Sequence, residues 1–133
     1  MGTLEEAREM FSKDLYATEL TGAYIEETGE DYAKCGLKLT DKHRNAYGGI
    51  MGGAIYTLAD LAFAVASNFG KDYATVSLNS NASFMSAPKG NVLYAEAKLI
   101  KDGRTNCFFD VKVTDDTGRV VAVVAFTGAH LHR

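Results

Sequence analysis

Residues 53–68 read GAIYTLADLAFAVASN, and this stretch decides the fold. Apolar side chains occupy nearly every face of the helix that it would form, which is typical of a helix enclosed by other elements rather than lying on a surface. Small side chains recur along it and would let neighbouring backbones come close: Ala54, Ala59, Ala62, Ala64 and Ala66. Gly70 is a natural cap after the last turn. We therefore predict a central helix that is buried all round and packed against a sheet.

The sequence on both sides of this helix predicts strands. Four segments with alternating apolar and polar residues follow it, separated by turn sequences. They run from Ala74 to Met85, from Val92 to Lys101, from Thr105 to Thr114 and from Arg119 to Leu131. Before the helix, a strand that starts at Gly22 and another from Tyr32 to Leu39 predict a hairpin.

The N-terminal segment predicts an amphipathic helix over residues 3–16, with a capping box formed by Thr3 and Glu6. The expected architecture is one α+β domain over residues 1–133. It consists of the N-terminal helix and a core of about residues 20–131, in which a long curved antiparallel sheet wraps around the central helix.

Composition narrows the functional classes. The 133 residues carry 14 basic and 17 acidic side chains, so no cationic excess points to a nucleic-acid binder. The N-terminus lacks a basic and apolar leader, and glycines interrupt the longest low-charge stretch, so we expect a cytoplasmic protein without membrane association. Cys35 and Cys107 lack metal-site spacing and are expected to be buried thiols. A domain of this size has little room for a deep pocket, which favours a ligand site in a groove or between subunits.

Asp60 is the single charged side chain between Gly53 and Asn68. A carboxylate on an apolar helix is costly unless it is paired, hydrogen-bonded or exposed to a site. In a structural interpretation, Asp60 caps another backbone segment or pairs with a lysine from the sheet or from a second subunit. In a functional interpretation, Asp60 is a catalytic carboxylate that opens on a cleft.

The loop before the helix, residues 48–53, reads GGIMGG and brings two glycine pairs to the helix N-terminus. Free backbone N–H groups and the helix dipole favour negative charge there, as an oxyanion site requires. Glycine pairs also serve ordinary turns, so both interpretations stay open. Asp60 lies about two turns beyond the glycines, and a base and an anion-binding helix end could therefore flank one substrate.

The stretch from His43 to Gly53, followed by Leu58-Ala59-Asp60, resembles the HxNxxGxxHGGxxxxxxD signature of the PaaI-like hotdog-fold acyl-CoA thioesterases. The spacing from Asn45 to Asp60 matches throughout, and the downstream strand and turn pattern extends the resemblance over roughly residues 20–130. The resemblance implies a hotdog fold in a homodimer that pairs edge to edge, with a dimer of dimers beyond it. It also implies hydrolysis of a small or medium acyl-CoA, with no metal and no cofactor beyond the coenzyme A of the substrate.

The resemblance assigns catalytic roles by position. Asp60 would be the catalytic carboxylate, acting as general base on water or as nucleophile on the thioester carbon. The backbone N–H of Gly52 would polarise the thioester carbonyl, and Asn45 would orient the carbonyl or the water. Ser77 would hydrogen-bond the water and come with Asp60 from the opposite subunit. A thioester is an activated acyl donor, so a placed base and an oxyanion donor meet its main needs.

The resemblance also implies substrate contacts. Lys89, Lys101 and Arg104 would contact the phosphates of coenzyme A, although ordinary solvated turn cations explain each of them as well. The resemblance also places Gly53 among the residues that bind the substrate. The acyl pocket would be lined by apolar or amphipathic side chains that could equally be core: Tyr47, Met51, Tyr56, Phe63, Phe84 and Met85.

Met51 occupies the position of the family's histidine, and a thioether neither donates a hydrogen bond nor carries a proton at neutral pH. The alternative function is therefore a hotdog protein that binds acyl-CoA or a related ligand without catalysis. Hydration or dehydration of an acyl thioester is a weaker third hypothesis, because no suitable histidine follows the glycines. His43 matches the family's loop histidine and is expected to hold the loop.

Two further patterns complete the predictions. Polar residues alternate along one predicted strand and would line a water-containing cleft or face solvent: Ser77, Asn79, Asn81 and Ser83. His130 and His132 alternate near the C-terminus. We interpret them as tail histidines rather than a metal pair, because no acidic or cysteine partner lies at fitting spacing.

Overall fold

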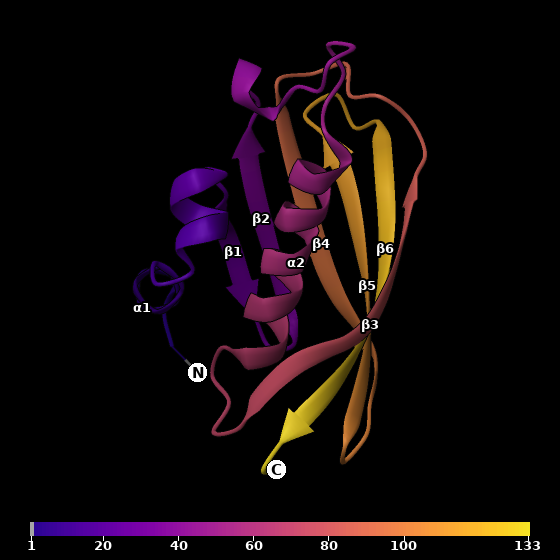
Figure 1. Cartoon of the computed structure of the whole chain (residues 1–133). Helices are drawn as coiled ribbons and strands as arrows, with labels where there is room; N and C mark the ends of the chain where they lie inside the picture. The colour runs from indigo at the N-terminus through magenta and orange to yellow at the C-terminus, as the bar shows by residue number, and fades with distance from the viewer. Residues whose placement is uncertain (1) are drawn as a thin grey trace.

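The computed structural model describes residues 2–133, and its elements follow the predicted order (Figure 1). The helical elements are α1 (Leu4–Phe11), the π-helix η1 (Tyr16–Leu20), the 3₁₀ turn η2 (Asp41–His43) and α2 (Gly52–Asn68). The strands are β1 (Tyr24–Gly29), β2 (Tyr32–Lys38), β3 (Ala74–Phe84), β4 (Val92–Asp102), β5 (Asn106–Asp115) and β6 (Val120–Leu131). The predicted central helix and every predicted strand are present within one or two residues of their expected ends.

All six strands join one antiparallel sheet in the order β1-β2-β4-β5-β6-β3. The sheet twists around α2, which lies along one face (Figure 1). Leu58 and Val65 of α2 are fully buried against inward-facing strand residues such as Leu93 and Val111. The core therefore lies between the helix and the sheet, as predicted.

The prediction that α2 is buried all round is wrong along one stripe. Gly53 and Asp60 are exposed on one face of the helix, and Thr57 and Ala64 are half-buried on it; no strand of the sheet covers this face. Tyr56 lies at its edge, where its hydroxyl bonds Ser80 of β3. The sheet curves around only part of the helix. One protomer therefore leaves a face of its own central helix open, and Asp60 lies in the middle of that face.

The N-terminal helix is shorter than predicted. The capping box is confirmed, because Thr3 Oγ1 accepts from Glu6 N at 3.2 Å and Thr3 N donates to Glu6 Oε1 at 3.0 Å. However, α1 ends at Phe11, and the chain makes a turn before η1 begins. Ala7 and Phe11 supply the buried contacts of α1, whereas Leu15 is exposed, so extending the helix would bury little further apolar surface.

A β-bulge in β3 corrects the predicted polar stripe. Ser77 lies opposite Gly128 of β6, but Asn79 lies opposite Thr127, so Leu78 is an extra residue in the strand. Partners in an antiparallel pair project to the same face, and Gly128 faces the core while Thr127 faces outward. Ser77 therefore projects to the helix side, away from Asn79, Asn81 and Ser83 on the outer face.

Cys35 and Cys107 are free and buried, as predicted. Burial raises the pKa of the Cys35 thiol to about 12, so this thiol is unreactive at neutral pH. No helix within residues 2–133 has both the length and the apolar character to cross a membrane.

Candidate active site

The N-terminus of α2 presents free backbone donors. The helix begins at Gly52, after Met51 in an extended conformation. Met51 N donates to His43 O at 2.8 Å, and the amide of Ala54 bonds back to Met51 O. The N–H groups of Gly52 and Gly53 find no acceptor within residues 2–133. These two N–H groups can donate hydrogen bonds to an oxygen atom on which negative charge develops, as an oxyanion site requires.

Asn45 holds the loop that precedes this helix end. Its Oδ1 accepts from Tyr47 N at 3.0 Å and from Gly49 N at 3.1 Å, and its backbone closes a turn with Gly48. Gly48 adopts a φ of 83°, which favours glycine. The Nδ2 donor of Asn45 has no partner in the described part of the chain. Its action on a substrate carbonyl or water stays a prediction.

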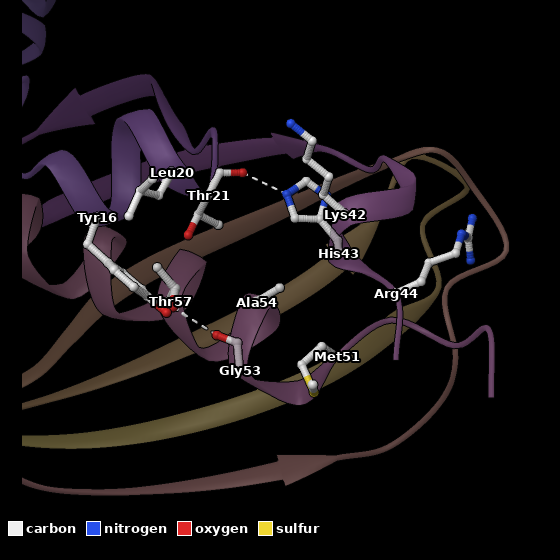
Figure 2. A pocket seen from close by; sticks show the side chains of 10 residues that line it. All are labelled: Tyr16, Leu20, Thr21, Lys42, His43, Arg44, Met51, Gly53, Ala54 and Thr57. Atoms are coloured by element: carbon white, nitrogen blue, oxygen red, sulfur yellow. Dashed lines mark hydrogen bonds between the residues drawn. The ribbon is translucent and has the colours of Figure 1, made fainter. Parts of the chain in front are cut away.

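His43 holds the same loop from its other side, as predicted. Thr40 N donates to its Nδ1 at 3.0 Å, so Nε2 carries the proton and donates to Thr21 O at 2.6 Å (Figure 2). Both ring nitrogens are therefore occupied by backbone groups. His43 cannot take the place of the histidine that Met51 replaces.

Within its own described chain, Asp60 neither caps a backbone segment nor pairs with a lysine of the sheet; a lysine from a second subunit stays a prediction. Its carboxylate forms no hydrogen bond or ion pair with any group of residues 2–133, and its side chain lies on the open stripe of α2. Desolvation by the surrounding apolar surface, reinforced by the negative charge of Asp14, raises the pKa of Asp60. An unpartnered carboxylate with a raised pKa is suited to accept a proton.

The donors and the carboxylate do not meet within one chain. Asp60 follows Gly52 by eight residues, so it lies about 12 Å further along the helix axis. This distance is too great for one thioester carbonyl to bind Gly52 N–H while a water on the same carbon contacts Asp60. The prediction that both groups flank one substrate therefore fails for a single protomer.

Ser77 lies on the neighbouring strand β3, at a similar position along the axis of α2 to Asp60. Tyr56 OH bonds Ser80 Oγ at 2.7 Å, and Asn68 bonds the backbone of Thr75 at 2.7 and 3.0 Å. These contacts fix β3 alongside α2 on either side of Ser77 and Asp60. The two predicted catalytic side chains of this part of the site thus come from adjacent elements.

Two cavities lie beside the N-terminus of α2. One has a volume of about 280 Å³ and is lined by Met51, Gly53, Ala54 and Thr57 together with Tyr16, Leu20, Thr21, Lys42, His43 and Arg44 (Figure 2). The other has a volume of about 430 Å³ and is lined by Gly49, Ile50, Gly52, Ile55, Phe84, Met85, Ser86, Ala87 and Pro88. At about 100° per residue, their helical lining residues lie on nearly opposite sides of α2.

The predicted acyl-pocket residues divide into three groups. Met51, Phe84 and Met85 line one or the other cavity. Phe63 is 2% exposed and stacks on Phe126 at 4.6 Å, so it is core and its predicted place in the pocket is wrong. The remaining two residues do not line either cavity: Tyr56 packs against Phe126, and Tyr47 is 99% exposed.

The three predicted phosphate-binding residues do not gather in one chain. Lys89 precedes β4, whereas Lys101 and Arg104 lie at its far end, and the ten residue steps of this strand span about 33 Å. Successive turns of an antiparallel meander lie at opposite ends of the sheet, so Lys89 is far from Lys101 and Arg104. Lys42 and Arg44, which line the smaller cavity on either side of His43, were not predicted as candidate site residues, although Arg44 lies within the signature stretch and Lys42 directly precedes it.

Asp115 is the other residue that the sequence analysis missed. It is 2% exposed, and its Oδ2 accepts from Lys89 N at 2.7 Å and from Gly90 N at 3.0 Å. Its Oδ1 accepts from Thr117 Oγ1 at 2.6 Å and from the amides of Thr117 and Arg119, each at 3.0 Å. These bonds, the Thr117 hydroxyl foremost, lower the pKa of Asp115 despite its burial. The turn sequence Asp-Asp-Thr-Gly was the available signal.

His130 is not a loose tail residue. Its side chain is 3% exposed, with Nδ1 bonded to Thr75 Oγ1 at 2.7 Å and Nε2 to Asp102 Oδ1 at 2.6 Å. Arg133 binds the other oxygen of Asp102 at 2.9 Å. The residue therefore joins β3, β6 and the β4–β5 hairpin. Within residues 2–133, no cluster of three or more metal-ligating side chains is found.

A curved antiparallel sheet around a central helix is the fold that the resemblance to the hotdog thioesterases predicts. Residues 47–122 match the family model described as the thioesterase superfamily. A protein of Archaeoglobus fulgidus named "Putative esterase" is 32% identical over 124 residues, which cover 93% of this chain and 80% of that protein. The chain belongs to the thioesterase superfamily.

Solved structures support the same fold. The PaaI protein of E. coli, from the phenylacetic acid degradation operon, superposes with a TM-score of 0.83 at 21% identity, covering 97% of this chain and 96% of that one. A hypothetical thioesterase protein of Streptococcus pneumoniae, solved with coenzyme A, gives a TM-score of 0.79 at 26% identity over 90% of this chain and 95% of that one. This chain therefore has the hotdog fold.

Proposed function

We propose that the protein hydrolyses a small or medium acyl-CoA to the free acid and coenzyme A. The observation that carries this proposal is that one helix holds two unsatisfied groups, the backbone N–H of Gly52 and the carboxylate of Asp60, about 12 Å apart. Within one chain, the two groups are too far apart to act on the same thioester. A second copy of the chain can supply the missing half, as the family resemblance implies.

In the proposed reaction, the thioester carbonyl oxygen accepts from Gly52 N–H of one protomer. Asp60 of the second protomer takes a proton from a water molecule while the water oxygen attacks the carbonyl carbon. Gly52 N–H stabilises the oxyanion, and the carbon–sulfur bond then breaks. The thiolate of coenzyme A takes up the proton that Asp60 received from the water, which regenerates the Asp60 carboxylate, and the carboxylic acid leaves. Ser77, beside Asp60, would hydrogen-bond the attacking water.

Strand β3 is the edge through which two copies would pair. It is bonded on one side to β6 and has no strand on its other side in the described chain. Apolar side chains are exposed along it, among them Val76, Leu78 and Phe84. An uncovered edge strand with exposed apolar residues is a site for pairing with another chain. Such pairing would bring Asp60 and Ser77 of one copy toward the helix end of the other.

Mixed oligomers test the composite site. Asp60→Asn removes the base, and Gly52→Pro removes the amide donor at a helix position that tolerates proline. Each variant alone should release little free thiol from acyl-CoA. Co-expressed in equal amounts, random pairing into two-fold dimers should restore about a quarter of the wild-type rate, because half of the dimers are mixed and each has one intact site. The mixed dimers can be isolated through a different tag on each variant. If these isolated mixed dimers are inactive, the composite site is contradicted.

Met51 supports the second candidate, binding without catalysis. Its side chain is 51% exposed at the rim of the smaller cavity and offers no proton or hydrogen-bond donor. Free thiol release from a panel of acyl-CoAs distinguishes the two functions. Calorimetric binding of acyl-CoA without any turnover, unchanged in Asp60→Asn, would favour the binding protein.

A further inference from the structure

The two cavities beside the N-terminus of α2 differ in chemistry. The smaller one contains two cationic side chains, Lys42 and Arg44, and no acidic residue. The larger one contains no charged side chain at all and is lined mostly by apolar groups such as Ile50, Ile55 and Met85. The two cavities thus flank the N-terminal end of the helix on nearly opposite sides.

We propose that the smaller cavity receives the phosphate-bearing arm of the thioester, with Lys42 and Arg44 as its phosphate contacts, and that the larger cavity receives an uncharged, apolar acyl group. This inference rests on the proposed function, because it takes the thioester carbonyl to lie at Gly52. It replaces Lys89, Lys101 and Arg104, the contacts that the resemblance implied, with two residues next to the site.

Lys42 is available for such a contact. Its ammonium group has no hydrogen bond or ion pair in the described structure; among the described lysines, Lys71 alone is paired, with Asp31 at 2.7 Å. Arg44 is partly engaged: Nη1 donates to Gly48 O at 2.9 Å, and Nε lies 3.6 Å from the exposed Asp41. Its guanidinium is half exposed and keeps donors for a phosphate, which it can bind in a bidentate way.

The position of these two side chains also fits a long arm. His43, between them, accepts from the Met51 amide at 2.8 Å, which ties their loop to the helix end. Figure 2 shows the charged ends of Lys42 and Arg44 extending outward from this loop in different directions, with Arg44 on the side away from Tyr16 and Leu20. They would therefore meet the remote phosphates of the arm rather than the thioester itself.

A pair of substrates with the same acyl group tests this assignment: the acyl-CoA and the acyl-N-acetylcysteamine thioester, which has no phosphate. Lys42→Gln and Lys42→Gln/Arg44→Gln are compared with Lys112→Gln, a matched loss of charge on the outer face of the sheet. The double variant should raise KM for acyl-CoA about 10-fold with kcat unchanged, because charge-assisted hydrogen bonds are lost. KM for the phosphate-free thioester should not change, nor should either KM in Lys112→Gln.

Three results would overturn the assignment. The KM for acyl-CoA could stay unchanged in the double variant, or KM could rise equally for both thioesters, which would mark an effect on the loop. In the third result, Lys89→Gln rather than the double variant raises KM for acyl-CoA alone. The last would place the arm in the larger cavity. Calorimetric binding of free coenzyme A to the same variants keeps the test independent of turnover. If the wild type hydrolyses neither thioester but the double variant binds coenzyme A about 10-fold more weakly, the proposed function fails, and only the assignment of Lys42 and Arg44 as phosphate contacts stands.

Discussion

Asp60 and Asp115 are the same residue type in opposite circumstances. Asp115 is enclosed at the β5–β6 turn and accepts five hydrogen bonds, which lower its pKa. Asp60 lies on the open stripe of α2 without a partner, and desolvation raises its pKa. A carboxylate whose lone pairs are filled by backbone donors can hold loops together but cannot accept a proton at neutral pH. A carboxylate left without donors keeps its basicity.

The two carboxylates nevertheless both contribute to the proposed site. Asp115 binds the amides of Lys89 and Gly90, and Arg119 Nε donates to Ala87 O at 3.0 Å. These bonds fix the β3–β4 loop, whose residues Ala87 and Pro88 line the larger cavity. One carboxylate therefore shapes the proposed acyl cavity, and the other is proposed to do the chemistry.

Asp60→Asn should give the largest loss of activity. The amide keeps the size of the side chain but cannot accept a proton from water, so kcat/KM for acyl-CoA should fall about 1000-fold, within the range for a general base. Because folding raises the pKa of Asp60, the ionised form destabilises the fold above that pKa. The neutral amide should leave the Tm unchanged or raise it by about 1–2 °C, since solvent screens an exposed charge. Activity that survives would mean that Asp60 is not the base.

Asp115→Asn should reverse this pattern, with a loss of stability larger than any direct effect on chemistry. An asparagine places an NH₂ donor against amides that now donate to a carboxylate, so buried N–H groups lose their acceptor. The Tm should fall by on the order of 10 °C in thermal unfolding. The matched control is Asp116→Asn, at the neighbouring exposed position. Equal Tm losses in the two variants would show that Asp115 has no special role.

The lowered pKa of Asp115 also predicts how the stability of the fold changes with pH. Its contribution to stability is present above the unfolded pKa of an aspartate, about 3.9, and is lost as the pH falls toward the lower folded pKa. The wild type should therefore lose Tm on acidification more steeply than Asp115→Asn. Parallel Tm curves between pH 6 and pH 3 would contradict the link between these hydrogen bonds and stability.

Met51→His tests whether Asp60 and the free amides suffice by themselves. An imidazole at the first residue before α2 would add a donor near the thioester carbonyl, and one added oxyanion donor could raise kcat by about 10-fold or more. The measurement is steady-state thiol release, with Met51→Gln as a donor-bearing control without a titratable ring. An unchanged kcat in both variants would assign position 51 to loop packing.

The sequence predicted the parts of the fold that depend on local pattern. The 17 residues of α2, the strands and the turn at Gly70 follow from apolar spacing and glycine, and Gly70 indeed has a φ of 79°. Errors arose where long-range geometry decides. The bulge at Leu78 turned Ser77 away from Asn79, and the open stripe of α2 depends on how far the sheet curves, which no local period encodes.

The site shows the same division. The signature placed Asn45 in the loop before α2 and put Gly52 and Asp60 on the helix about two turns, or 12 Å, apart. The structure was needed to show that Asp60 has no partner in the described chain and lies on an uncovered face of the helix. The hairpin ends separated Lys89 from Lys101, because a meander alternates its turns between two ends. Asp115 was missed because its five partners come from two loops that are distant in sequence from each other.

Asp14→Asn should give the smallest effect, and it addresses the cause of the difference between the two carboxylates. Desolvation is the main cause of the raised pKa of Asp60, and the negative charge of Asp14 adds to it. Removing that charge should shift the acidic limb of the kcat/KM profile to lower pH, because Asp60 must be ionised to act as a base. The shift should shrink in high salt, which screens Asp14 but not desolvation. Glu9→Gln, on the exposed face of α1, is the matched control. A shift toward higher pH would mean that Asp60 is not the group titrating in this limb.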